Sequence, residues 1–211
     1  MDDRGAVRRP RLGIYGGTFA PPHNGHLRAA LDFLRGAELN SLLIMPAAVP
    51  PHKRIDAGDD PEVRLEMARA AFEGLDPRIS VSDYEIRRGG ASYTWVTLTH
   101  FAETTDAELV FLCGTDMFCS LDTWRCPEII FEKAAIACVL RENNPRMLLE
   151  VQKSEERYRR NYGARIIRIE GTPVEISSTE IRNRVWEGQS IDGLVPQRVI
   201  HFLQQHDLYK K

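Results

Sequence analysis

Two histidines stand just after an apolar run near the N-terminus, in a pattern suited to phosphate. The stretch GGTFAPPHNGH carries His23 and His26 three positions apart. Gly16 and Gly17 leave room for the backbone to approach a phosphate closely. The histidines fall at the expected start of a helix, where free N–H groups and the helix dipole favour anions. The pattern predicts a phosphate site. A capped turn and a zinc pair are the alternatives, and no third zinc ligand is evident.

A second polar group lies in the late stretch EISSTEIRNRV. Ser177 and Glu180 have the spacing of a capping box, which predicts that a helix begins there. The hydroxyls of Ser178 and Thr179 would then stand beside the free N–H groups of the first turn, with Arg182 one turn further on. This arrangement suits a triphosphate, although by itself it also fits a well-capped surface helix.

The segments around these motifs alternate between apolar runs and helical patterns. Strands are expected at 12–17, 41–46, 79–82, 108–114, 134–140 and 164–170, and helices at 25–36, 60–74, 94–103, 178–188 and 196–209. Asp60 is the expected cap of the second helix, with Pro61 in its first turn. Continuous apolar strands separated by helices predict an α/β, Rossmann-like doubly wound parallel sheet with helices on both faces. Ligands bind such sheets beyond the C-terminal strand ends, where the first motif lies.

Length and composition limit the classes of protein that fit. A chain of 211 residues with 43% hydrophobic residues can bury a full core, and one domain spanning 1–211 is expected, with about the first ten residues flexible. The net charge of -2 argues against a general nucleic-acid surface. No apolar run is long enough for a signal peptide or a membrane span, which predicts a cytoplasmic protein.

Local charge and cysteine patterns indicate structural roles. Arg157, Arg159 and Arg160 have glutamates beside them, which predicts a solvated helix face. Cys113 and Cys138 lie in apolar runs without a CxxC pair, so we expect reduced core residues rather than a disulfide or a zinc site.

The two phosphate motifs together resemble the HxGH nucleotidyltransferase superfamily, which has HxGH early in the chain and ISSTxxR late. The intervening stretches VPPHK, YEIRRGGASYT and FLCGTDMFCSLDTW and the ending LVPQRVIHFLQQHDLY resemble the bacterial nicotinate mononucleotide adenylyltransferase family. The resemblance runs from about residue 12 to residue 209. Phosphopantetheine adenylyltransferases share the first and last motifs but not the middle ones.

This resemblance implies an activity. The family joins ATP and nicotinate mononucleotide, which gives nicotinate adenine dinucleotide and pyrophosphate in NAD biosynthesis. It also implies Mg²⁺ held mainly through the ATP phosphates, with no protein metal site. The mononucleotide phosphate would attack the α-phosphorus of ATP in line.

The resemblance also assigns roles to residues. His23, His26 and Arg182 would be catalytic and would contact the ATP phosphates. Gly114 and Asp116 would hold the adenosine ribose, and Ile176 would flank the adenine. The remaining ATP contacts would come from Gly16, Gly17, Thr18, Phe19, Ser178 and Thr179.

The mononucleotide would be bound by residues from the middle of the chain. Thr94 and the backbone near Trp124 would receive the nicotinate carboxylate, and the Trp124 indole would stack on the pyridine ring. Lys53 would face the mononucleotide phosphate. Arg125 stands where many relatives have an aromatic residue and would add positive charge near the carboxylate. Ala20 stands where many have Asp or Asn, so no side-chain role is available there.

Other hypotheses about the function also fit parts of the sequence. The acceptor could be the amide mononucleotide or phosphopantetheine, and the same fold could serve as a non-catalytic nucleotide sensor or as a nucleic-acid-binding module. Asp83 and Glu85 do not make a convincing carboxylate pair for acid–base work. The sequence does not set the oligomeric state.

Overall fold

The computed structural model describes residues 8–50, 60–140, 144–172 and 174–210. Its strands form one all-parallel sheet in the order β3-β2-β1-β4-β5-β6. This confirms the predicted doubly wound α/β fold. The strands are β1 (Arg11–Gly17), β2 (Ser41–Pro46), β3 (Ile79–Val81), β4 (Glu108–Gly114), β5 (Ala134–Leu140) and β6 (Ile166–Glu170). The strand order reverses between β1 and β4, and a crevice opens beyond their C-terminal ends.

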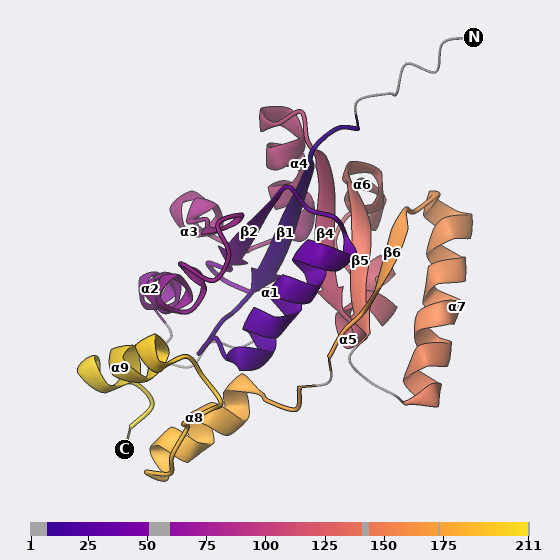
Figure 1. Ribbon diagram of the computed structural model, residues 1–211. Coiled ribbons are helices and arrows are strands. Elements are labelled where there is room, and N and C mark those ends of the chain that lie inside the picture. Colours follow the sequence, from indigo (N-terminus) through magenta and orange to yellow (C-terminus); the bar gives the residue numbers. More distant parts are fainter. Residues whose placement is uncertain (1–7, 51–59, 141–143, 173, 211) are drawn as a thin grey trace.

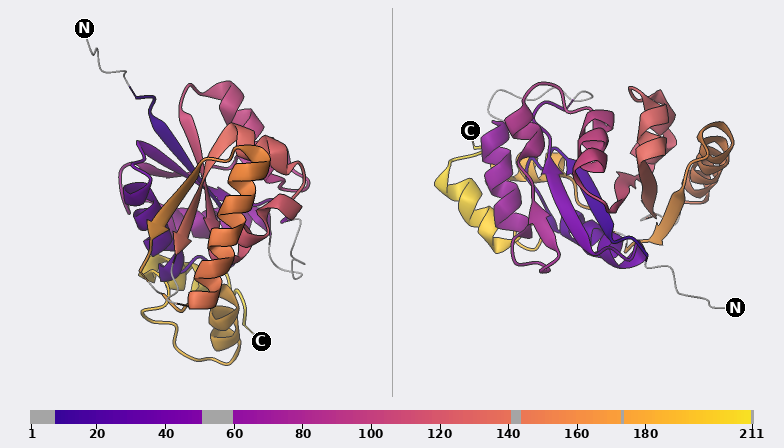
Figure 2. Two further views of the ribbon diagram at one scale, coloured as in Figure 1. Left: turned by 90° about the vertical axis from the view of Figure 1, so that its right-hand side faces the viewer. Right: turned by 90° about the horizontal axis from the view of Figure 1, so that it is seen from above.

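Helices cover both faces of this sheet (Figures 1 and 2). One face packs against α1 (Asn24–Gly36), α2 (Pro61–Phe72) and α9 (Gln197–Gln205), and the other against α4 (Thr94–Thr104), α6 (Pro127–Lys133) and α7 (Pro145–Tyr162). The other helical elements are α3 (Tyr84–Arg88), α5 (Thr115–Cys119), the 3-10 turn η1 (Leu121–Thr123) and α8 (Ser178–Trp186). The sequence patterns did not predict α3, α5, η1 or α6, which are too short to show a helical period.

Side-chain caps start two of the predicted helices where expected. The Asp60 carboxylate accepts from the Glu62 N–H at 2.8 Å, directly before Pro61 at the start of α2. The Ser177 hydroxyl accepts from the Glu180 N–H at 3.1 Å at the start of α8. These bonds satisfy N–H groups that have no partner within the helix.

The prediction of a solvated face on α7 holds for Arg159 and Arg160 but is wrong for Arg157. Arg159 and Arg160 are exposed. The Arg157 guanidinium instead turns back to the Asp122 carboxylate, with Nε 2.6 Å from Oδ2. The reason is its neighbour Tyr158, which is fully buried and brings this side of α7 against α5.

The buried cysteines behave as the apolar runs predict. Cys113 and Cys138 are register partners on β4 and β5, and both are buried free thiols. Burial raises the pKa of Cys113 well above its ordinary value and that of Cys138 to about 12. Both groups are therefore protonated, inert parts of the core.

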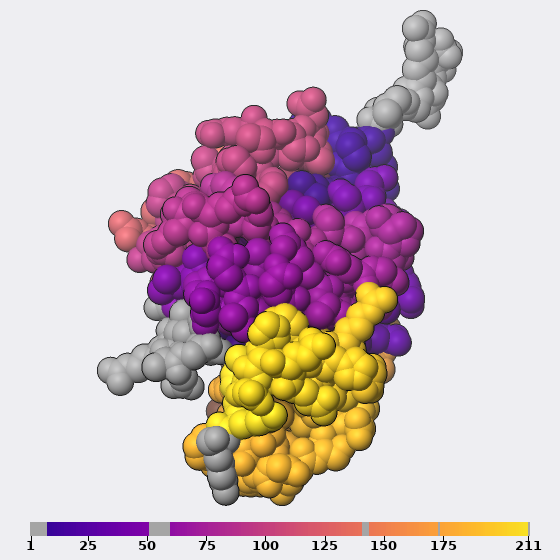
Figure 3. Space-filling model, turned by 90° about the vertical axis from the view of Figure 1, so that its left-hand side faces the viewer, coloured from indigo at the N-terminus to yellow at the C-terminus, as the bar shows by residue number. Residues whose placement is uncertain are grey.

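The C-terminal segment forms a lobe below α2, visible in orange and yellow in Figure 3. Two hydrogen bonds tie its connecting loop to the start of α1: Asn24 donates its N–H to the Leu194 carbonyl at 2.9 Å and its amide to the Gly193 carbonyl at 2.8 Å. The inner side of α9 is buried in the core. Among the described residues, no helix combines the length and apolar character needed to cross a membrane.

We predict that Gly36→Ala destabilises the protein. A Cβ at Gly36 would lie 2.6 Å from Cγ2 of Ile169, a buried residue of β6. Alanine favours a helix by about 1 kcal/mol over glycine, but overpacking a core costs about 1–3 kcal/mol. We therefore expect a net loss of about 1 kcal/mol, or about 2–4 °C in Tm. Combining the change with Ile169→Ala should cost less than the sum of the two single variants, and additive costs would contradict the predicted clash.

Candidate active site

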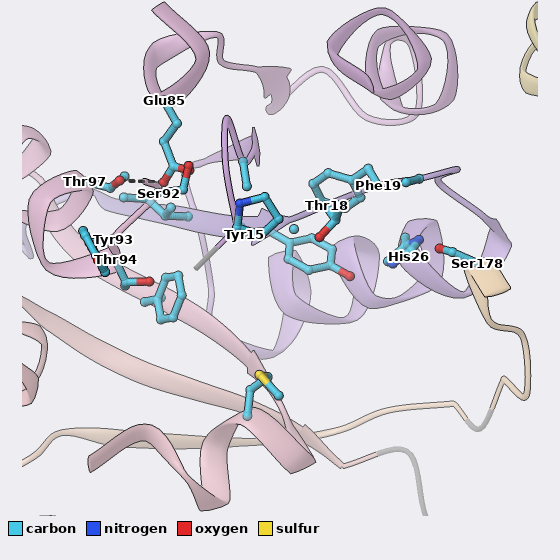
Figure 4. A pocket seen from close by; sticks show the side chains of 18 of the residues that line it. Tyr15, Thr18, Phe19, His26, Glu85, Ser92, Tyr93, Thr94, Thr97 and Ser178 are labelled. Carbon is cyan, nitrogen blue, oxygen red and sulfur yellow. Dashed lines mark hydrogen bonds between the residues drawn. The ribbon is translucent and has the colours of Figure 1, made fainter. Parts of the chain in front are cut away.

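A cavity of about 660 Å³ opens beyond the C-terminal ends of the central strands. That volume is ordinary for a small-molecule site. Figure 4 shows two groups of side chains along it, with Tyr15 between them. The histidine end contains Thr18, Phe19, His26 and Ser178, and the threonine end contains Glu85, Ser92, Tyr93, Thr94 and Thr97.

The two histidines of the first motif lie at the start of α1. His23 is buried at the N-cap position, and its ring stacks on the His26 ring with centroids 3.6 Å apart. His26 Nδ1 accepts from the His23 N–H at 3.2 Å. An accepting Nδ1 places the proton of the neutral His26 ring on Nε2. The capped turn and the phosphate site, weighed as alternatives from the sequence, are therefore compatible.

The glycines around these histidines make room for rings. A Cβ at Gly25 would lie 3.0 Å from the His23 Nδ1 atom, so the glycine of HxGH gives the imidazole its space. A Cβ at Gly17 would lie 2.8 Å from the ring of Phe19. Phe19 has a φ of 51°, a strained conformation for this residue type, and its buried ring is packed edge-on against Phe72. Around Gly16 there is room for a ligand, since a Cβ would meet only Phe111, at 3.7 Å.

The second motif joins the first at the histidine end. The Ser178 hydroxyl donates to the Pro21 carbonyl at 2.9 Å, and Arg182 Nη1 donates to the Ala20 carbonyl at 2.7 Å. Arg182 Nη2 also donates to the Thr179 hydroxyl at 3.3 Å. The loop after β1 and the first turn of α8 are therefore two walls of one cavity. Side chains from both walls line it: His23, His26, Ile176, Ser178, Thr179 and Arg182.

The threonine end is built by the start of α4 and the loop after η1. Thr94 is the first residue of α4, whose free N–H groups suit an anion. The Arg125 guanidinium lies 5.0 Å from the centre of the Tyr93 ring. The Trp124 indole packs edge-on against Phe111 at a centroid distance of 6.3 Å. All five residues line the cavity.

Gly114 and Asp116, both expected at the site, are not among the described residues that line the cavity. Gly114 ends β4, and Asp116 lies in the first turn of α5; both are exposed, next to Met117, which does line the cavity. Lys53 lies outside the described residues.

Arg64, a fully buried arginine on α2, was not predicted from the sequence to lie near the site. Its guanidinium donates to the carbonyls of Thr18 at 3.1 Å and Ala48 at 2.8 Å, and also to that of Ala47. These carbonyls follow β1 and β2, so one side chain ties the two strand ends that border the cavity. A signal was present, because Arg64 falls on the same helical face as the buried Ala68 and Ala71.

Glu85, for which the sequence predicted no acid–base pairing with Asp83, lies in the cavity wall. It is buried, and Thr97 Oγ1 donates to its Oε1 at 2.6 Å. Ser92, whose hydroxyl accepts from the Ala48 N–H at 2.9 Å, also hydrogen-bonds Glu85. Burial raises the pKa of Glu85 above its ordinary value, although both hydroxyl bonds oppose the shift. Asp83 instead pairs with Arg87 at the surface, so the two carboxylates are not a pair.

Comparisons with a family model and with individual proteins agree on the family to which this chain is similar. The cytidylyltransferase-like family model matches residues 14–184. A protein named probable nicotinate-nucleotide adenylyltransferase from Clostridium beijerinckii is 38% identical over 207 residues, which cover 95% of this chain and 99% of that protein. One of the same name from Clostridium botulinum (strain Eklund 17B / Type B) is 36% identical over 201 residues, 95% of this chain and 98% of the relative.

A solved structure shares the fold. Nicotinic acid mononucleotide adenylyltransferase of Plasmodium falciparum, complexed with NaAD, superposes with a TM-score of 0.73. The match covers 95% of this chain and 97% of that one at 16% sequence identity.

We predict that Glu85 makes stability fall as pH rises. Its pKa is higher in the folded protein than the ordinary value of about 4.5, so the folded state loses stability as the pH climbs from about 4.5 through the folded pKa. Glu85→Gln stays neutral and can still accept from Thr97. Urea unfolding from pH 4.5 to 8 should show the wild type losing stability relative to this variant. Glu103→Gln, at an exposed position of α4, is the matched control. A constant difference across this range would contradict the prediction.

Proposed function

The chain belongs to the nicotinate-nucleotide adenylyltransferases within the cytidylyltransferase-like family, and from this premise we propose that its cavity joins ATP to nicotinate mononucleotide. The products are nicotinate adenine dinucleotide and pyrophosphate, a step of NAD biosynthesis. The histidine end takes the ATP phosphates, and the threonine end takes the nicotinate ring. The Plasmodium protein with the same fold holds NaAD, a molecule with both kinds of group.

One observation carries the proposal. Arg182 and Ser178 bond the carbonyls of Ala20 and Pro21, so the HxGH turn and the ISSTxxR helix start face one space. A polyphosphate in that space meets two imidazoles, two hydroxyls, a guanidinium and the N-termini of two helices, α1 and α8. The same cavity continues to an aromatic and cationic end that suits a pyridine ring with a carboxylate.

The chemistry requires orientation more than acid–base groups. The mononucleotide phosphate carries negative charge near pH 7, so it can attack the α-phosphorus without a general base. In-line alignment of two bound reactants contributes up to about 7–11 kcal/mol to lowering the barrier. Glu85 takes no part in proton transfer and serves to shape the wall.

His26 stabilises the charge that develops at the α-phosphate. Its Nδ1 accepts from the His23 N–H, which places the ring proton on Nε2, the atom proposed to donate to a phosphate oxygen. His23 supports this ring by stacking on it. Arg182, Ser178 and Thr179 hold the β- and γ-phosphates and the pyrophosphate that leaves.

Magnesium fits this site as an ion carried by the nucleotide. The described residues contain no group of three or more His, Cys, Asp or Glu side chains that could hold a metal ion. The histidine end presents hydrogen-bond donors, which suit phosphate oxygens. Phosphates and water are the usual ligands of Mg²⁺ in such sites. When bound, the ion neutralises part of the negative charge of the triphosphate.

The acceptor is recognised at the threonine end. The first N–H groups of α4 with Thr94 receive the nicotinate carboxylate, and the Trp124 indole stacks on the pyridine ring. Arg125, fixed over Tyr93, adds a positive charge that favours the acid over the amide. Lys53 is proposed to face the mononucleotide phosphate, and Gly114 with Asp116 the adenosine ribose.

A comparison of acceptors tests the function. Pyrophosphate release from ATP and Mg²⁺ should be fast with nicotinate mononucleotide and at least about tenfold lower in kcat/KM with nicotinamide mononucleotide, because the amide lacks the charge that Arg125 and α4 attract. Phosphopantetheine should give no release. Equal rates with acid and amide would contradict the proposed carboxylate-binding site. No pyrophosphate release with any acceptor would favour a nucleotide sensor.

We predict that His26→Ala lowers kcat by about two orders of magnitude or more, the cost of losing one donor to the reacting charge. The variant also loses the bond to the His23 N–H, worth about 1 kcal/mol of stability. His26→Glu is the control, because glutamate at this helix position restores the bond but donates nothing. Both variants should be slow, while only the alanine variant should melt earlier. Near-normal turnover in His26→Ala would exclude His26 from the mechanism.

A further inference from the structure

A buried tyrosine joins α7 to the segment that precedes Trp124. The Tyr158 hydroxyl donates to the Phe118 carbonyl at 2.6 Å and accepts from the Leu121 N–H at 3.1 Å. Tyr158 is fully buried, and its ring packs edge-on against Phe118. Both bonds therefore form in a dry environment, where hydrogen bonds are strong and costly to lose.

The neighbouring Arg157 binds the same segment by charge. Its Nε lies 2.6 Å from Asp122 Oδ2, its Nη2 lies 3.3 Å from Oδ1, and Nη2 also donates to the Cys119 carbonyl at 3.2 Å. Such two-point contact between guanidinium and carboxylate fixes direction as well as distance. Partial burial would raise the pKa of Asp122, but the Arg157 bonds and charge outweigh it and hold the pKa below its ordinary value.

The anchored segment leads directly to the indole in the cavity. The backbone N–H of Trp124 donates to the Leu121 carbonyl at 3.2 Å. Leu121 is therefore bonded to Tyr158 through its N–H and to the Trp124 backbone through its carbonyl. The Thr123 hydroxyl donates to the Ser120 carbonyl at 2.7 Å, which stiffens the same turn. A shift of this turn relative to α7 would move the indole.

We propose that Asp122, Arg157 and Tyr158 are positioning residues that set the place of the Trp124 indole and thereby the affinity for the mononucleotide. The inference rests on the proposed function, in which Trp124 stacks on the pyridine ring. None of the three lines the cavity, so they act through the turn. The ATP phosphates are held separately, at the histidine end fastened by the bonds from Ser178 and Arg182. Asp116, proposed for the ribose, shares α5 with the bonded carbonyls but precedes them, so ATP binding depends less on this anchor than the indole does.

The test is a split between two Michaelis constants in the full-length enzyme. Asp122→Asn keeps the size of the side chain but removes the charge that holds Arg157, and Tyr158→Phe removes the hydroxyl. Each should raise KM for nicotinate mononucleotide by about five- to tenfold, the scale of losing one strong hydrogen bond. KM for ATP should stay within about twofold.

Two further variants make the result decisive. Glu155→Gln breaks ion pairs with Arg159 and Arg168 on α7 and β6 and should change neither constant. Trp124→Ala is the reference and should raise KM for the mononucleotide selectively. If it does so while Asp122→Asn and Tyr158→Phe have no effect, the anchor is refuted and the proposed function stands. If Trp124→Ala has no effect, the stacking role fails and the anchor with it. An equal rise in both constants for Asp122→Asn and Tyr158→Phe would indicate general loosening and also refute the anchor.

Discussion

The active cavity depends on two side chains late in the sequence reaching two carbonyls near its start. Ser178 bonds Pro21 across 157 positions, and Arg182 bonds Ala20 across 162. The parallel sheet makes this closure possible, because β6 and β1 both end on the side where the C-terminal ends of the strands lie. From there the chain returns past α1. The Thr172 N–H donates to the buried Asp32 carboxylate of α1 at 3.2 Å, which guides the returning chain. Without this return, each phosphate motif would be an ordinary helix start.

Buried charges then fix the strand ends that carry the cavity wall. Three backbone carbonyls accept hydrogen bonds from Nη1 and Nη2 of Arg64, which offsets part of the cost of removing a charge from water. Glu85, with Ser92 and Thr97, holds the loop before α4 against the end of β2. Such groups contribute more to shape than to net stability, because desolvation cancels much of their attraction.

Sequence patterns predicted the layout well, because strands buried on both faces of a parallel sheet are continuous apolar runs. The bounds expected for β2, β4 and β5 are those observed. Residues of both phosphate motifs line one cavity, as their resemblance to known motifs implied. Two of the features that the sequence did not predict share one cause. The partner of Arg157 is 35 positions away, and the burial of Glu85 depends on α4, so neither local spacing nor composition could reveal them. Arg64 is different, since the helical period already placed it on the inner face.

The cavity has two ends that are fastened to different parts of the fold. Contacts between the loop after β1 and α8 hold the histidine end. The threonine end is held by α4 and by the turn that α7 supports. This separation makes the site modular. Mutations that reshape the half proposed to bind the ring can accumulate in a lineage without disturbing the half proposed to bind the phosphates. New partner molecules can therefore be recruited by one half while the bond-forming chemistry is inherited unchanged by the other.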